Sequence, residues 1–237
     1  KKENSLSGVM ANSKDAGRQY TASPVQQQEK AQIDFNALKD KLEVFKKAVL
    51  KKYSFTMGIV LLPAPAFPLF EEEEQLPKEV IDSKPLHMVM LISEEQYKNI
   101  PKIKAEVLKL IKETKENIWL HIKTEVDLWN YGLDSKYEML DAIAQGFPIF
   151  DKGFLGALRV ASIHKTLVLR KFDKYVASYV IGGSLIRGTA NKDSDVDVFV
   201  IIDDTDVKRM SRVELLERLR GMIYEYIREA TALAGVK

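Results

Sequence analysis

The chain has 237 residues, of which 46% are hydrophobic and 30% are charged, and its formal net charge is +2. This length allows one large domain or two small ones with a sizeable buried core. The near balance of charge argues against a protein that coats nucleic acid or a membrane surface. The absence of cysteine excludes disulfides and thiolate chemistry, and the three histidines lack metal-ligand spacing.

The chain offers no targeting or membrane signal. No apolar run approaches the roughly 20 residues of a membrane span, and the start has no apolar signal region. We therefore expect a cytoplasmic protein with no membrane partner, for which oligomerisation is open. The chain starts without methionine and ends abruptly, which suggests a piece of a longer protein.

The first elements follow from composition and periodicity. Residues 1–33 are rich in Ser, Gln, Lys and Asn, so we expect a disordered or loose arm. Apolar residues at helical spacing follow Asp34, which is placed to cap a helix. A strand is predicted at 55–62 and ends at a group of prolines. The charge run Glu71–Glu74 is typical of a solvated loop.

The middle of the chain continues the alternation of strands and helices. A strand is predicted at 86–92, then a helix that opens near Pro101, then a strand at 118–122. Ser135 has the spacing of a capping box with the glutamate three residues later, which predicts a short helix that Gly146 closes.

The last third predicts a helix at about 155–172, strands at 176–181 and 196–202, and a terminal helix capped by Ser211. The order strand, link, strand, helix thus occurs twice, which predicts an internal repeat. Lys-Tyr pairs before the first strand of each copy align the two. We expect an α/β fold of two related modules, residues 34–153 and 154–237, each a small mixed sheet with helices packed against it.

A group of small and acidic residues lies between the last two strands. Gly182 and Gly183 let the backbone turn tightly and approach a ligand, and Ser184 opens a helix whose free amides suit phosphate. Asp195 and Asp197 lie two apart in the next strand, so both carboxylates face the same side. Paired carboxylates repel one another unless a cation lies between them, and such hard oxygen ligands suit Mg²⁺.

This ordered combination resembles the nucleotidyltransferase superfamily, which includes DNA polymerase β, poly(A) polymerases and aminoglycoside nucleotidyltransferases. The resemblance covers roughly residues 165–230. The stretch from Lys165 to Met210 is similar to archaeal nucleotidyltransferase-domain proteins in which two modules follow one another. The resemblance implies transfer of a nucleoside monophosphate from a nucleoside triphosphate to a hydroxyl, with release of pyrophosphate. It also implies that two Mg²⁺ ions serve as the cofactor. The acceptor, whether RNA, protein or a small molecule, is left open.

The resemblance also implies roles for particular residues. Asp195 and Asp197 would be the catalytic metal ligands. Gly182, Gly183 and Ser184 of the turn would hold the phosphates. Arg187 and Lys192 are candidates for further phosphate contacts, and a solvated role suits these two residues equally well.

The first copy lacks this motif. The repeat places Val60-Leu61-Leu62 at the Gly-Gly-Ser position, and Pro85 and His87 at the positions of the two aspartates. We expect His87 to be a packed or surface histidine, and Glu125 and Asp127 to be acids without partners. The first copy is therefore expected to be a scaffold or regulatory module.

The superfamily also uses a third carboxylate on a later strand, which is not found before Lys237. Asp203, Asp204 and Asp206 are interpreted as loop acids. We therefore expect weak catalysis from the chain as given. Two rival hypotheses stay open: a nucleotide-binding or interaction module without catalysis, and a nucleic-acid-binding protein with a basic face.

Overall fold

The computed structural model describes residues 24–203, 205, 210–220 and 224–235. The chain forms two compact units, residues 1–40 and 41–237, and each is described by itself. The described part of the first unit belongs to helix α1 (Pro24–Lys52), which begins well before the predicted cap at Asp34. The rest of the predicted loose arm lies outside the described residues.

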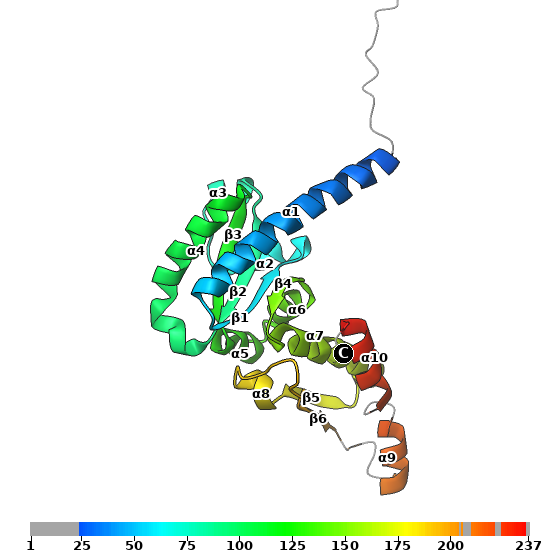
Figure 1. The fold of residues 1–237 in the computed structure, drawn as a ribbon. Coiled ribbons are helices and arrows are strands. Elements are labelled where there is room, and N and C mark those ends of the chain that lie inside the picture. The colour runs from blue at the N-terminus through cyan, green and yellow to red at the C-terminus, as the bar shows by residue number, and fades with distance from the viewer. Residues whose placement is uncertain (1–23, 204, 206–209, 221–223, 236–237) are drawn as a thin grey trace, which may run out of the picture. The chain divides into compact units, whose positions relative to one another are not determined.

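The second unit contains a four-stranded mixed sheet in the order β3-β2-β1-β4 (Figure 1). Its strands are β1 (Thr56–Leu61), β2 (Leu86–Ile92), β3 (Ile118–Thr124) and β4 (Phe147–Asp151). β2 and β3 run parallel, and the other pairs are antiparallel. The first three strands confirm the sequence prediction. β4 was not predicted, because it is short and contains Pro148, which a sheet tolerates only at an edge.

Helices and 3-10 turns connect and cover these strands. The predicted helix near Pro101 is present as α4. The elements are η1 (Ala64–Ala66), α2 (Phe67–Glu73), α3 (Lys78–Asp82), η2 (Glu94–Asn99), α4 (Ile100–Thr114), α5 (Glu125–Leu133) and α6 (Tyr137–Gln145).

Helix α7 (Phe154–Phe172) joins the four-stranded sheet to a two-stranded antiparallel sheet (Figure 1). It contacts β1 and β4 on one side and β5, α8 and α10 on the other. The elements after α7 are β5 (Val176–Ile181), α8 (Gly183–Ile186), β6 (Val198–Ile202), α9 (Arg212–Arg220) and α10 (Tyr226–Ala234). None of the described helices has the length and apolarity that a membrane crossing requires.

Two predicted boundaries were wrong. Ser135 does not cap α6, which begins without a side-chain cap after Lys136, because Ser135 adopts a left-handed φ of 60°. A capping box forms instead where Thr124 and Asp127 bond to one another's backbone amides at the start of α5. Ser211 caps the terminal helix as predicted, accepting a bond from Glu214 N at 3.2 Å. Its helical parts are α9 and α10, and residues 221–223 lie outside the described residues.

The second concerns the strand predicted at 196–202, which begins at Val198. Asp195 and Asp197 therefore precede β6 rather than belonging to it.

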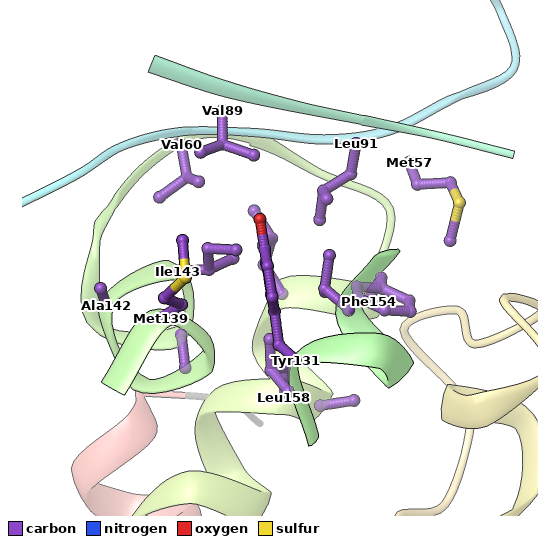
Figure 2. Close-up of a cluster of buried hydrophobic side chains, with 14 of the residues drawn as sticks. Met57, Val60, Val89, Leu91, Tyr131, Met139, Ala142, Ile143, Phe154 and Leu158 are labelled. Atoms are coloured by element: carbon purple, nitrogen blue, oxygen red, sulfur yellow. The ribbon is translucent and has the colours of Figure 1, made fainter. Parts of the chain in front are cut away.

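The main hydrophobic core lies between the four-stranded sheet and helices α5, α6 and α7. Figure 2 shows Tyr131 at its centre, with Val60 and Leu91 of the strands on one side and Ile143 and Leu158 of the helices on the other. Burial of each such aliphatic side chain stabilises the fold by roughly 1.5–3 kcal/mol. This core also includes α8, so it extends into the region of the predicted motif.

The two hairpins β1–β2 and β5–β6 have the same register. Thr56 pairs with Ile92 as Val176 pairs with Ile202, and each pairing has an irregularity at the next residue. The ladder continues beyond each strand pair, where Leu62 N donates to His87 O and Gly182 N donates to Asp197 O, both at 2.9 Å. In this register Leu62, rather than the predicted Val60, takes the place that Gly182 has, and His87 takes the place that Asp197 has.

The Glu71–Glu74 run is not a solvated loop, because it belongs to α2 and its end. Glu74 Oε1 and His121 Nδ1 lie 2.8 Å apart, and His121 Nε2 and His87 Nδ1 lie 2.9 Å apart. Both histidines are fully buried. His87 Nε2 has no hydrogen-bond partner among the described residues and lies 3.4 Å from Glu71 Oε1. A chain of polar groups thus links α2 to β2 and β3.

Burial and the nearby His121 lower the pKa of His87 from 6.5 to about 4. Burial alone would raise the pKa of Glu74, but the hydrogen bonds from His121 and Trp119 outweigh it and lower that pKa to about 2. His87 therefore favours the neutral form in the folded protein, and Glu74 favours the ionised form.

We predict a loss of stability as the pH falls from about 6.5 to 4. In this window the unfolded chain binds a proton at residue 87 that the folded chain does not, so folding weakens by up to the order of 3 kcal/mol. The contribution of Glu74 is lost only below its unfolded pKa of 4.5, as the pH falls toward 2. Urea unfolding at several pH values should show a shallower decline for His87→Asn than for wild type. Equal declines between pH 6.5 and 4.5 would contradict the assignment.

Candidate functional site

A tight turn ends β5 and begins the short helix α8 (Figure 1). Gly182 is extended, and Gly183 adopts a φ of +66°, which glycine reaches without steric cost. A Cβ atom at Gly183 would overlap Asp197 Oδ2. The carboxylate of Asp197 therefore lies directly against the turn, at a place that only a residue without a side chain leaves open.

Asp195 and Asp197 lie just before β6 in an extended, alternating segment. Both are exposed, whereas Val196 and Val198 are half-buried. The bond from Gly182 N to Asp197 O extends the pairing of β5 and β6 past the end of the strand. The alternation of exposed and half-buried residues agrees with the predicted two faces, one acidic and one apolar.

The loop between α8 and β6 is held by its own hydrogen bonds. Asn191 N donates to Ser194 Oγ at 3.0 Å, and Ser194 N donates to Asn191 O at 3.1 Å. At the start of the loop, Thr189 N donates to the backbone oxygen of Ser184, also at 3.0 Å. Arg187 at the start of this loop and Lys192 near its middle are both exposed. Both cations are thus free to reach an anionic ligand in solvent.

A hollow of about 610 Å³ opens beside this loop, with polar groups of Lys192, Ser194 and Asp195 in its wall. The rest of the wall is largely apolar. One polar pair nearby is His164 and Tyr179, whose Nδ1 and Oη lie 2.8 Å apart, and burial raises the pKa of Tyr179. The apolar lining comes from four elements and from Val196, which precedes β6: Val160 and Ala161 of α7, Val198, Val200 and Ile202 of β6, Leu219 of α9, and Ile227 of α10.

Asp195 and Asp197 are the predicted oxygen ligands for a metal, and both side chains are exposed. Among the described residues, no group of three or more His, Cys, Asp or Glu side chains is placed to hold a metal ion. Asp203 accepts bonds from Thr205 instead, while Asp204 and Asp206 lie outside the described residues. Two exposed carboxylates leave most coordination positions of Mg²⁺ to water and to phosphate oxygens, which is the arrangement that this ion prefers.

In the β1–β2 pair, the place that corresponds in register to Asp197 has a different kind of side chain. His87 stands at the position of Asp197 and is buried against His121, and Phe67 stacks on it with ring centroids 4.4 Å apart. His87 is thus a packed histidine, as predicted. Glu74 and His121 were not predicted to join His87. They are distant from it in the sequence and meet it only in the folded chain, so no local pattern indicates the contact.

The prediction that Glu125 and Asp127 have no partners was wrong. Asp127 completes the capping box of α5, and Glu125 Oε2 accepts a bond from Glu94 N at 3.0 Å. Both acids lie at the end of β3, where the chain enters a helix.

Comparison with known proteins identifies a domain family in the C-terminal part of the chain. Residues 162–231 match the family model described as a nucleotidyltransferase domain. This segment contains most of α7, the two strands β5 and β6, the turn at Gly182 and both aspartates. A nucleotidyltransferase domain is therefore present in the C-terminal part of the chain. Neither the curated proteins nor the solved structures give a match.

We predict that Gly183→Ala destabilises the protein more than Gly235→Ala. The two glycines have nearly the same φ, +66° and +67°, but a Cβ at Gly235 would meet no atom within 4 Å. The control should therefore lose only the backbone term of about 1–2 kcal/mol, whereas Gly183→Ala must also displace Asp197. Urea unfolding of both variants measures the difference, and equal losses would mean that Asp197 does not lie against the turn.

Proposed function

We propose that the chain transfers a nucleoside monophosphate from a nucleoside triphosphate to a hydroxyl acceptor. The observation that carries this proposal is the close approach of the Asp197 carboxylate to Gly183, which joins the two halves of the motif. In the reaction, the acceptor oxygen attacks the α-phosphorus, the bond from that phosphorus to pyrophosphate breaks, and the hydroxyl proton leaves to water. The acceptor stays open among RNA, protein and small molecules.

The residues of the turn and of the loop would divide the work. Asp195 and Asp197 would hold Mg²⁺, which supplies charge stabilisation for the attacking and leaving oxygens when it is bound. The amides of Gly183 and Ser184 would hold the β- and γ-phosphates, because backbone N–H groups at a helix start that lack a helical partner point toward the ligand. Gly182 would contribute the close approach of its backbone, since its own amide already donates to Asp197 O. Arg187 and Lys192, both exposed, would neutralise phosphate charge.

We also propose that residues 34–153 form a degenerate copy of the module in residues 154–237. The equal register of the two hairpins, with an irregularity at the same place, supports this hypothesis. A helix also precedes each strand pair at the same distance. Three residues separate α1 from β1, and three residues separate α7 from β5. The polar chain from Glu74 to His87 fills the place of Asp197, so the first copy would not bind a triphosphate.

A nucleic-acid-binding role has weaker support. It would need a basic face, but three of the lysines that would form one are in ion pairs: Lys46 with Glu43, Lys52 with Glu106, and Lys165 with Asp141. Binding to RNA or DNA that falls steeply with salt would favour this role over nucleotidyl transfer. A module that binds nucleotide without catalysis differs from an enzyme only in turnover, so pyrophosphate release is the measurement that separates these two.

We predict that Mg²⁺-dependent binding of ATP or GTP is lost in Asp195→Asn/Asp197→Asn. The amides keep the shape of the carboxylates beside Gly183 but remove both negative charges, so the metal loses its protein ligands. Calorimetric titration of wild type with each nucleotide and Mg²⁺ should give heat, and the double variant should give none. Asp203→Asn is the matched control, because that exposed acid bonds to Thr205 outside the proposed site.

Binding by a folded double variant at the wild-type affinity would remove the motif as the site. Binding by wild type without pyrophosphate release, in the presence of RNA, protein and small-alcohol acceptors, would favour the module without catalysis.

A further inference from the structure

The loop that connects the turn to the two aspartates is packed onto the N-terminal part of the second unit. We define this segment, residues 187–194, as the motif loop. Ala190 within it is 7% exposed, and Leu185 just before it is 3% exposed. Both belong to the same hydrophobic cluster as Leu128 and Tyr131 of α5. The loop is thus anchored in a core that it shares with residues outside the nucleotidyltransferase match.

Gly153, which precedes α7, touches the backbone of the motif loop. Gly153 has a φ of +125°, and a Cβ atom there would overlap the carbonyl carbon of Asn191 and the amide nitrogen of Lys192. Backbone atoms cannot rotate away as the end of a flexible side chain does. The position of Gly153 is itself fixed, because Asp151 Oδ1 accepts bonds from Gly153 N and Leu155 N at 2.8 and 2.9 Å.

A second contact holds the motif loop near its start, at Gly188. A Cβ atom at Gly188 would lie 2.7 Å from Glu125 Cδ and Oε1, so the side chain of Glu125 lies flat against that backbone. Glu125 is 9% exposed, and its other oxygen accepts the bond from Glu94 N. Residues of α5 and of the loop before α7 therefore touch the motif loop at two places, Gly188 and the peptide between Asn191 and Lys192.

We propose that Glu125 and Gly153 are positioning residues for the nucleotide site. Neither would touch the substrate; they fix the motif loop, and through it the direction in which Lys192, Asp195 and Asp197 enter the site. Helix α5 and the segment before α7 would thus act as the rigid support of the nucleotidyltransferase motif. A loop held at two places has little freedom to lose when a ligand binds, which favours affinity. This inference rests on the proposed function for its ligand, but its geometry stands independently.

Gly153→Ala tests the first contact, with Gly235→Ala as the control for a positive φ in open space and Gly132→Ala as the control for an ordinary φ. A Cβ at Gly132 would meet its nearest atom, Leu140 Cδ1, at an ordinary 3.8 Å. Hydrogen–deuterium exchange of the motif loop should rise in Gly153→Ala, with protection of the four-stranded sheet unchanged. The affinity for Mg²⁺-ATP should weaken roughly tenfold or more, because small displacements of a site are costly. Gly132→Ala should match wild type in both measurements.

Glu125→Ala and Glu125→Gln test the second contact without backbone strain at Gly153. The alanine variant removes the surface on which Gly188 lies, so exchange of the motif loop should rise and nucleotide affinity should fall. The glutamine variant keeps the volume and one acceptor oxygen for Glu94 N, so both measurements should return close to wild type. This rescue would not be expected if the charge of Glu125 acted directly on a ligand.

The exchange measurement needs no nucleotide, so it separates the two hypotheses. If wild type binds no nucleotide, the proposed function fails, and raised exchange confined to residues 187–194 still supports the positioning role. Unchanged exchange of these residues in both Gly153→Ala and Glu125→Ala would overturn the positioning role. An increase spread evenly over the four-stranded sheet would overturn it as well, because it would indicate general destabilisation.

Discussion

The candidate site depends on the approach of one carboxylate to one glycine. Asp197 can lie beside the turn only because Gly183 has no side chain, and the bond from Gly182 N to Asp197 O holds the two segments at that separation. The antiparallel pairing of β5 and β6 supplies the same constraint from the other side. Every role proposed for the turn, for Asp195 and for the loop between them follows from this one juxtaposition.

The same backbone arrangement occurs in the first hairpin with different side chains. Leu62 and His87 form the equivalent bond at the same distance, but the carboxylate is replaced by a buried histidine that is linked through His121 to Glu74. Strand register is set by backbone pairing and by the apolar faces, so it can persist while the polar residues at the strand end change. A hairpin of this geometry is therefore not sufficient for the chemistry, which depends on the residues at the turn and at the strand start.

Helix α5 and the residues just before α7 also contact the loop of the motif. Leu185 and Ala190 are buried in a core with α5, and Gly153 and Glu125 contact the loop at two places. A family match limited to residues 162–231 therefore does not contain all the residues that hold its own loop in place. Helix α7 belongs to both regions, since it contacts β1 and β4 as well as β5.

The sequence by itself determined the type and order of most elements, because periodic apolar residues, prolines and glycines act over short distances. It also determined the motif, since Gly182, Gly183, Asp195 and Asp197 have recognisable types at a recognisable spacing. Tertiary structure alone decided the edge strand β4, the roles of Glu74 and His121, and the contacts of Glu125 and Gly153 with the motif loop. These features depend on pairing, burial and close approach between residues that are distant in the chain, and such contacts leave no periodic or local pattern in the sequence.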